Sequence, residues 1–277
     1  MNRKLILSLA ALFIVTQLIG LWTANFFIAE EVTVTFISED PGDPINSIYL
    51  IAVVLGGALF WIIVIRFFPE KWLYYVFKAL ESFIIFITSA LLFSTFYDSL
   101  LVVPLSLLIV LLRIVFAKHI WLRNATSIIS TAVVGALLGV SLGIIPVIIF
   151  MILLSVYDFI AVFKTKHMVK MAKAISSKNL SFTYAIPTKE HTFELGTGDM
   201  VIPLVFSASL LGAAKLNPAL EFPLYFIPPV VILIASLIGL LWTINFVSKR
   251  VGTALPALPP QTILMLLAFV VLKLVGF

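Results

Sequence analysis

Two acidic residues lie in stretches of sequence that are otherwise apolar enough to cross a membrane. Asp158 lies within Ser155-Val156-Tyr157-Asp158-Phe159-Ile160-Ala161-Val162-Phe163, and Asp199 lies within Leu195-Gly196-Thr197-Gly198-Asp199-Met200-Val201-Ile202-Pro203. A carboxylate at membrane depth costs on the order of 3 kcal/mol on insertion scales, so such a residue marks a functional site by default. Each acid falls at the end of its apolar stretch that borders the same polar segment. Consecutive antiparallel helices would therefore bring both carboxyls to one level.

The chemistry available to two facing carboxyls is general acid and base catalysis. In a site of low dielectric constant both cannot ionise cheaply, so the pair shares a proton. The ionised partner can take a proton from an attacking water while the protonated partner polarises a carbonyl group. Taken singly, each acid has an ordinary explanation: a hydrogen-bond partner inside the bundle for Asp158, and a helix N-cap for Asp199. Taken together, they predict peptide-bond hydrolysis inside the membrane.

Glycine and proline segments accompany the two acids. Gly196 and Gly198 immediately precede Asp199, and glycine accepts backbone angles that other residues resist. The segment Leu255-Pro256-Ala257-Leu258-Pro259-Pro260 opens the last apolar stretch. Its prolines remove backbone donors and favour an extended chain with free carbonyl groups. The simpler explanation is a helix that begins with proline in its first turn.

The elements that must position these residues are membrane helices. Hydrophobic residues make up 62% of the 277 residues, charged residues only 11%, and the mean hydropathy is +1.20. Soluble domains carry about 25% charged residues. We therefore predict an all-α membrane protein with nine transmembrane helices, each near the roughly 20 residues that a bilayer requires. The predicted spans are Leu5–Ala29, Ser47–Ile65, Phe77–Phe96, Leu100–Phe116, Ala125–Leu142, Ile144–Phe163, Asp199–Ala214, Phe222–Val247 and Leu258–Val275.

Charge asymmetry predicts the orientation. With the N-terminus cytoplasmic and the C-terminus outside, all Lys and Arg residues except Lys215 and Lys273 fall on the cytoplasmic side, as the positive-inside rule requires. We expect one transmembrane domain over residues 1–277, with spans one to six in 1–163, a cytoplasmic loop in 164–198 and spans seven to nine in 199–277. The basic residues form no dense run, so no nucleic-acid partner is expected. The chain contains no cysteine.

Other features of the sequence favour packing or weaker alternatives. Gly135, Gly139 and Gly143 recur at intervals of four residues, which predicts close helix packing. All three histidines fall in predicted loops, so no Ser and His pair is expected at membrane depth. Glu190, His191 and Glu194 lack the spacing of a metal motif. A short echo between residues 19–26 and 238–246 resembles the inverted repeats of transporters.

Three motifs together resemble one known family. Tyr157-Asp158 in the sixth span, Gly196-Thr197-Gly198-Asp199 opening the seventh, and Pro256-Ala257-Leu258 at the ninth are similar to the signatures of the presenilin and signal peptide peptidase family of intramembrane aspartyl proteases. The nine-span layout extends the resemblance over the chain. The surroundings of Asp158 and of Pro256 look closer to presenilin, and Gly198-Asp199-Met200-Val201-Ile202-Pro203 looks closer to signal peptide peptidase. This mixture is typical of an archaeal-type homologue.

The resemblance implies a presenilin-like fold and a set of site residues. It implies that Asp158 and Asp199 are catalytic, and that substrate binding falls to seven neighbours: Tyr157, Gly196, Thr197, Gly198, Pro256, Ala257 and Leu258. It implies no metal or organic cofactor, and as partners the transmembrane helices of substrate proteins, the surrounding lipid bilayer and a second copy of the chain in a homo-oligomer. We expect an integral multi-pass protein of a microbial cell membrane. The alternative function is a proton-coupled transporter in which Asp158 and Asp199 relay protons; a non-catalytic scaffold is a third.

Overall fold

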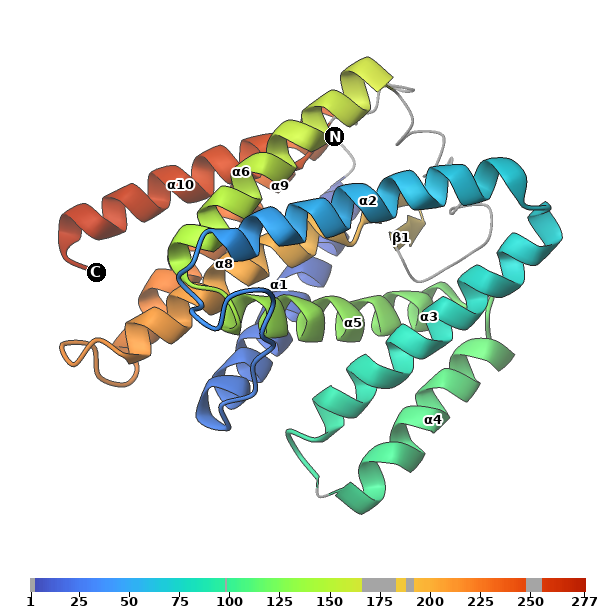
Figure 1. Cartoon of the computed structure of the whole chain (residues 1–277), viewed down its shortest axis with the longest axis horizontal. Helices are drawn as coiled ribbons and strands as arrows, with labels where there is room; N and C mark the ends of the chain where they lie inside the picture. Colours follow the sequence, from blue (N-terminus) through green and yellow to red (C-terminus); the bar gives the residue numbers. More distant parts are fainter. Residues whose placement is uncertain (1–2, 98, 166–182, 188–191, 248–255) are drawn as a thin grey trace.

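The protein is a bundle of long helices, shown as a computed structural model in Figure 1. The structure describes residues 3–97, 99–165, 183–187, 192–247 and 256–277. Within these ranges nine α-helices confirm the predicted all-α class. They are α1 (Arg3–Ala29), α2 (Ile45–Phe67), α3 (Glu70–Phe93), α4 (Ser99–Val115), α5 (Ile120–Val140), α6 (Ile144–Ile160), α8 (Gly198–Lys215), α9 (Ile227–Val247) and α10 (Leu258–Val275).

Each predicted span corresponds to one helix, but several boundaries differ. Eight helices in the described part of the chain are long and apolar enough to cross a membrane, and α4 is a shorter apolar helix. The third span begins at Glu70, not at Phe77, and the fifth begins at Ile120, not at Ala125. Both predictions were wrong for one reason: a search for apolar runs stops at charged residues, whereas a membrane helix tolerates long charged side chains in its terminal turns, where they reach the polar interface.

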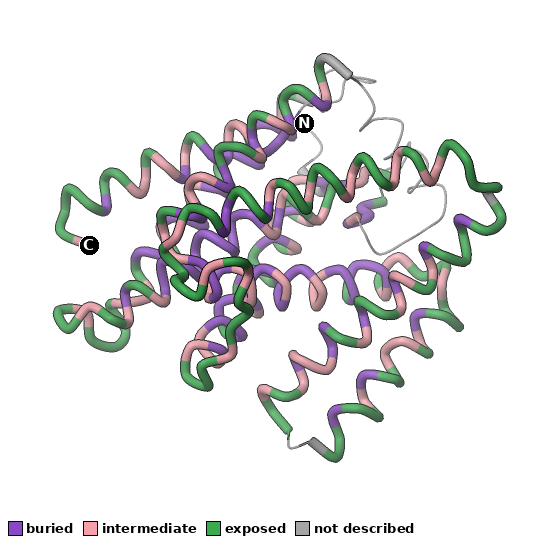
Figure 2. Tube along the Cα trace, viewed as in Figure 1, coloured by how far each residue is buried: buried purple, intermediate pink, exposed green. Residues whose placement is uncertain are grey.

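The centre of the bundle is α8, which is flanked by α1, α5 and α9 (Figure 1). Two-thirds of its span, 67%, is buried inside the protein, against 6% for α2. Figure 2 shows the same gradient, with buried positions gathered on the inner helices and exposed positions along α2 and α4. A helix that is apolar all round and exposed, as α2 is, needs lipid around it. Asp199 therefore begins the most enclosed helix of the protein.

Glycines allow α8 to approach its neighbours closely. A Cβ atom added at Gly135 would lie 2.7 Å from Leu204, and one at Gly139 would lie 2.5 Å from the carbonyl oxygen of Val205. Gly20 on α1 leaves the same kind of space, since a Cβ there would overlap the side chain of Leu204. Distances below about 3 Å mean that no side chain fits without movement. The predicted packing role of Gly135 and Gly139 is confirmed.

The structure also contains a buried cluster of charged side chains, which the search for apolar runs in the sequence did not predict. Glu81, inside the third span, is only 1% exposed and lies 3.0 Å from Nη2 of Arg113 on α4. Nζ of Lys78 lies 2.5 Å from Oε2 of the same carboxylate. The acids inside the spans are therefore not only Asp158 and Asp199. Glu81 differs from that pair because it is neutralised by two cations, which makes it a link between α3 and α4.

A short β-hairpin lies within the segment that the sequence analysis treated as one polar loop. Strand β1 (Thr183–Pro187) pairs antiparallel with β2 (Thr192–Gly196), in a register that places Thr183 opposite Gly196. Before it, α6 continues as a π-helical turn, η1 (Ala161–Thr165), and after α8 a 3-10 turn, η2 (Leu224–Phe226), leads into α9. Because β2 ends two residues before α8 begins, the hairpin leads directly to Asp199.

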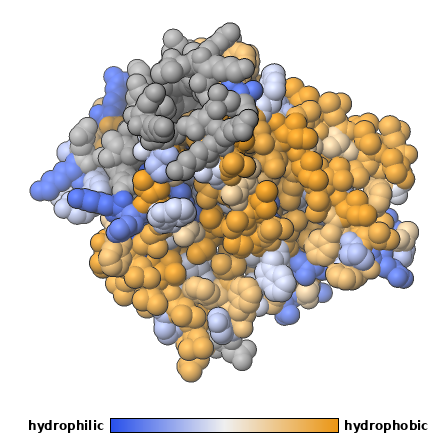
Figure 3. Space-filling model, turned by 180° about the vertical axis from the view of Figure 1, so that it is seen from behind, coloured by the Kyte–Doolittle hydropathy of each residue, from blue (hydrophilic) through white to orange (hydrophobic). Residues whose placement is uncertain are grey.

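The outer surface fits a bilayer. Seen from behind, the face in Figure 3 is broadly hydrophobic over the helices, and hydrophilic residues gather toward its margins. Exposed large apolar side chains occur along α2, α4 and α10, among them Leu59, Leu100 and Leu274. Such continuous apolar exposure is incompatible with water and is typical of lipid contact.

Candidate active site

Asp158 and Asp199 lie at the same end of two neighbouring helices. Asp158 falls in the last turn of α6 and is 6% exposed, while Asp199 is the second residue of α8 and is partly buried. The two carboxyls are close enough to interact electrostatically. The structure thus brings together the two acids that the sequence singled out.

The first turn of α8 is held by contacts that fix the backbone around Asp199. Nε2 of Gln17, a buried residue of α1, donates a hydrogen bond of 2.9 Å to the carbonyl of Met200. Pro203 has no amide, so the carbonyl of Asp199 lacks its usual helical donor. Thr197 precedes the helix as its N-cap residue and makes no side-chain capping bond. The sequence analysis did not select Gln17, whose place in an apolar span was its only signal.

The two glycines before Asp199 lack the left-handed backbone conformation that favours glycine. Neither Gly196 nor Gly198 has a positive φ, so the expectation that they adopt unusual backbone angles was wrong. A Cβ atom added at Gly196 would lie 3.8 Å from Oδ2 of Asp199, and one at Gly198 would meet nothing within 4 Å. Of the two positions, only Gly196 therefore lies within contact distance of the Asp199 carboxylate.

The Pro256-Ala257-Leu258 segment reaches the same site from α10. All three residues are buried, and the backbone amide of Leu258 donates a hydrogen bond to the Asp158 carboxylate. Ala257 has helical angles, φ −87° and ψ −26°, and the helix begins at Leu258 with Pro259 and Pro260 in its first turn. The prediction of an extended chain was wrong from Ala257 onward, because proline suits the first turn of a helix. Leu255 lies outside the described residues.

Close packing of α9 fixes where α10 begins. A Cβ atom added at Gly239 would lie 2.9 Å from Cα of Gln261 and 3.2 Å from the carbonyl carbon of Pro260. The two helices therefore touch through backbone at this point. Any side chain at position 239 would move the first turn of α10, and with it the Leu258 amide that faces Asp158.

Comparison with known proteins decides the family. The family model described as "Signal-peptide peptidase, presenilin aspartyl protease" matches residues 10–274. The chain belongs to this family of aspartyl proteases. It is accordingly a protease and an integral multi-pass membrane protein.

Solved structures share the fold. A presenilin family intramembrane aspartate protease in space group C222 matches with a TM-score of 0.72 at 18% identity, covering 98% of this chain and 99% of that one. A structure with the same description in space group P2 matches with a TM-score of 0.67 at 20% identity, covering 96% of each chain. No curated protein matches significantly. The predicted presenilin-like fold is confirmed.

In this member of the protease family, the hairpin is anchored to α5 beside the aspartates. The side-chain amide of Asn124 donates to the carbonyl of Ala185 at 2.8 Å, and its oxygen accepts the Ala185 amide at 2.9 Å. Nη2 of Arg123 lies 3.1 Å from Oε1 of Glu194 on β2 and also donates to the Thr183 hydroxyl. Asn124 thus completes the outer edge of β1 as a neighbouring strand would, and Arg123 holds both strands.

The side chain of Tyr184 anchors the hairpin to the helix bundle. Its side chain is fully buried, and its hydroxyl lies 3.3 Å from the hydroxyl of Thr16 on α1 and 3.3 Å from the carbonyl of Ser127 on α5. Burial raises the pKa of Tyr184 to about 12. The neutral phenol is therefore part of the docked state, and β1 is fixed to two helices at once.

Tyr157 is the last of the predicted site residues to place. Tyr157 precedes Asp158 on α6 and is partly exposed. Of the three residues that lack the spacing of a metal motif, Glu190 and His191 lie outside the described residues, and Glu194 is paired with Arg123. No cluster of His, Asp and Glu residues that could hold a metal occurs among the residues the structure describes.

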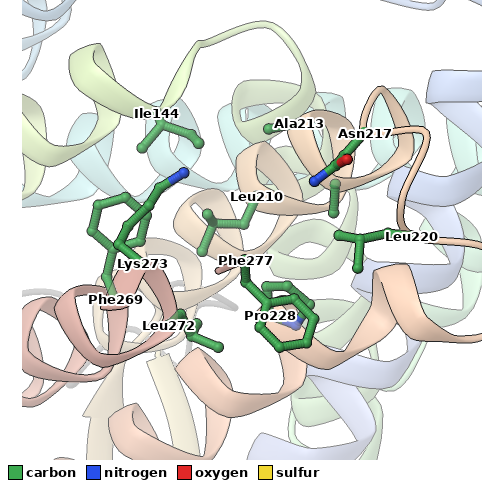
Figure 4. A pocket seen from close by; sticks show the side chains of 11 residues that line it. Ile144, Leu210, Ala213, Asn217, Leu220, Pro228, Phe269, Leu272, Lys273 and Phe277 are labelled. Carbon is green, nitrogen blue, oxygen red and sulfur yellow. The ribbon is translucent and has the colours of Figure 1, made fainter. Parts of the chain in front are cut away.

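Two cavities differ in their relation to the aspartates. One of about 160 Å³ lies between α3, α5 and α8 and is lined by Glu81, Ser130, Thr131 and Thr197 among others. Thr197, one of its lining residues, lies two positions before Asp199 in the sequence. The cavity is large enough to hold several water molecules. A smaller pocket of about 70 Å³, seen in Figure 4, lies at the far end of α8 beside Leu210 and Lys273. Because α8 is about 27 Å long, that second pocket plays no part in the chemistry.

Proposed function

We propose that Asp158 and Asp199 are the catalytic pair of an endopeptidase that hydrolyses peptide bonds within the transmembrane helices of substrate proteins. The observation that carries the proposal is the convergence of α6, α8 and α10, which brings the two carboxyls and the Leu258 amide together. One carboxylate removes a proton from water, and the other donates a hydrogen bond to the scissile carbonyl, with no cofactor. Family membership favours this function over the proton-coupled transporter.

The Leu258 amide gives the two aspartates different roles. A hydrogen bond from a backbone amide stabilises the ionised form of a carboxyl group. Asp158 accepts this bond, so it is the better candidate for the ionised general base. Asp199, which has the open glycine approach of Gly196 beside it, is then the protonated partner that meets the substrate carbonyl.

A substrate must be extended before the pair can act on it, because a helix shields its own peptide bonds. Its freed amides need new partners, since each unsatisfied backbone group in a membrane costs several kcal/mol. The second edge of β2 can supply them by strand addition, because β1 pairs with only one edge and β2 ends at Gly196 beside Asp199. On this proposal Gly196, Thr197 and Gly198 line the substrate path from one side, and Pro256, Ala257 and Leu258 from the other, with Tyr157 next to the base.

The hydrolytic water also needs a source at depth. The cavity bordered by Glu81 and Thr197 lies on the side of α8 that faces α3 and α5, with polar hydroxyls of Ser130 and Thr131 in its wall. Half of its eight lining residues are polar, and an ordered water needs two to four polar partners. We assign it the supply of water to Asp199.

Single substitutions test the catalytic pair. Asp158→Asn and Asp199→Asn should each lower cleavage of a single-span model substrate by at least about 10³-fold, since neither carboxyl can act as both acid and base. The matched control is Asp40→Asn, an exposed acid in the loop after α1, which should keep wild-type cleavage. Purified variants should retain the helical content and melting behaviour of the wild type. Full cleavage by either variant would overturn the assignment.

A further inference from the structure

A third cavity, larger than the one beside Asp199, is lined in part by the hairpin. It has a volume of about 670 Å³ and lies between α1, the start of α5 and β1. Its walls are mostly apolar, with Ala11, Leu12 and Val15 of α1 facing Ile128 of α5. The volume falls in the range of about 300–1,000 Å³ that small-molecule sites occupy.

The mouth of this groove is basic and aromatic. Lys118, His119 and Trp121 line one end of it, all three are exposed, and no acidic residue occurs among its described lining residues. Trp121 is 85% exposed, as expected of a tryptophan at the level of lipid headgroups. The groove then passes along two turns of α1, from Ser8 to Val15, or about 10 Å into the apolar layer.

The basic mouth is held in place by the protein. The linker between α4 and α5 is fixed by Arg113, which donates a hydrogen bond of 2.7 Å to the carbonyl of Ala117. The His119 amide bonds to the carbonyl of Phe116, and the two rings pack edge to face at 5.7 Å. A shallower groove of about 470 Å³ on the α4 side shares His119 and Trp121 with the first. The two apolar grooves therefore meet at His119 and Trp121.

We propose that this groove is a binding site for an anionic glycerophospholipid. The phosphate group would bind Lys118 and His119 at the headgroup level, one acyl chain would lie in the groove between α1 and α5, and the other would lie in the shallow groove beside α4. A second copy of the chain or a peptide segment is less suited, because the mouth selects a negative charge that is followed at once by apolar chains. The site is separate from the proposed catalytic pair, although β1 forms part of its wall through Ala185, Ile186 and Pro187.

The experiment measures retained lipid directly and does not depend on cleavage. The protein would be reconstituted in nanodiscs that contain equal amounts of phosphatidylglycerol and phosphatidylcholine. It would then be released into a neutral detergent, and native mass spectrometry would identify the lipids that it retains. The wild type should retain phosphatidylglycerol at least about fivefold over phosphatidylcholine. The K118Q/H119Q double variant should lose that preference, because a lysine near the headgroups contributes roughly fivefold and the His119 ring supplies an N–H donor to the phosphate. The control is Lys71→Gln, an exposed lysine that lines none of the described cavities, which should keep the preference.

A second pair of variants tests the acyl-chain groove. Val15→Trp fills it and should lower retention of both lipids about tenfold. Leu18→Trp places the same bulk on the same helix outside the groove and should leave retention unchanged. Equal retention of the two lipids by the wild type, an unchanged preference in K118Q/H119Q, or unchanged retention in Val15→Trp would overturn the proposal. Lipid-free dimers in place of lipid-bound monomers would assign the groove to a second copy instead.

Discussion

The backbone amide of Leu258 donates a hydrogen bond to the carboxylate of Asp158, so the first residue of α10 touches the last turn of α6. The residues are 100 positions apart in the sequence, and neither could be placed against the other from its own neighbourhood. Through this contact, the Pro256-Ala257-Leu258 segment interacts with Asp158 by its backbone and not by a side chain. Buried Ala257 and Pro256 hold the amide in place, while the Leu258 side chain packs in the core with Ile202 and Met265.

Removing only this hydrogen bond should slow catalysis. Replacing Leu258 by its α-hydroxy acid analogue turns the amide into an ester and deletes the N–H without changing the side chain. A hydrogen bond to a charged group is worth about 1.5–3 kcal/mol, so kcat should fall by roughly 10- to 100-fold. The measurement is single-turnover cleavage of a model substrate at saturating concentration.

The controls separate this bond from the side chain and from helix stability. An ester at Ile263, an exposed position of the same helix, removes a backbone donor far from Asp158 and should change kcat by less than about threefold. Leu258→Ala keeps the N–H and should act mainly through packing and substrate binding. A wild-type kcat in the Leu258 ester would show that the amide does not support the base.

Tyr184 should make the docked hairpin sensitive to alkaline pH. Its pKa is about 12 in the fold and about 10 when exposed to water. Between these values the folded state holds a proton that the unfolded state has lost, so stability falls as pH rises through this window and is fully present below pH 10. The loss should reach about 3 kcal/mol near pH 12.

Thermal unfolding between pH 8 and 11.5 checks this expectation. Tyr184→Phe should remove this component of the pH dependence, while Tyr75→Phe, at an exposed tyrosine, should leave it intact. Identical pH profiles for wild type and Tyr184→Phe would mean that the phenol is not buried in the docked state.

The orientation inferred from Lys and Arg asymmetry can be tested across a single helix. The chain contains no cysteine, so Glu39→Cys and Lys71→Cys introduce unique labelling sites on the two sides of α2. Both positions are exposed, and the 23 residues of α2 span about 35 Å. In intact cells an impermeant maleimide should label position 39 and not position 71. The reverse pattern would place the N-terminus outside, and labelling of both would mean that α2 does not cross.

The helices and the two aspartates were predictable because their signals are local. Apolar length reports a span by itself, and an isolated carboxylate in such a span is conspicuous without knowledge of its partner. The helix starts at Glu70 and Ile120 were missed because a search for apolar runs stops at the charged residues that both helices contain in their first turns. Glu81 was missed because one of its partners is distant in the sequence: Lys78 lies on its own helix, but Arg113 lies on the next one.

The hairpin could not be predicted because distant contacts decide it. Two five-residue strands are too short to be stable alone, and their docking rests on Asn124, which is 61 residues from Ala185. The alternation of Tyr184 and Ile186 was a weak signal in a segment dominated by lysines. Once α5 is in place, Asn124 and Arg123 supply what the isolated strands lack.

The pair of Arg123 and Glu194 should therefore couple hairpin docking to cleavage. Nearly all of Arg123 is buried, with 4% of its side chain exposed, and Glu194 is 21% exposed. Glu194→Gln keeps the shape but leaves a buried guanidinium without its carboxylate, which should destabilise the protein by about 2 kcal/mol. Cleavage should fall about tenfold, because β2 leads into the turn that carries Asp199.

A double-mutant cycle distinguishes this coupling from simple damage. Breaking a buried pair is costly, whereas replacing both partners by apolar residues is often neutral. The R123M/E194M variant should therefore regain stability relative to Glu194→Gln, with Asn124 and Tyr184 still holding β1.

Glu221→Gln, at an exposed glutamate after α8, is the control and should behave as wild type. Because the hairpin is docked again in the double variant, its cleavage should recover to within about threefold of wild type. Recovered stability without recovered cleavage would mean that the Arg123 or Glu194 charge acts on the substrate itself, and additive losses would mean that the two residues do not act through each other.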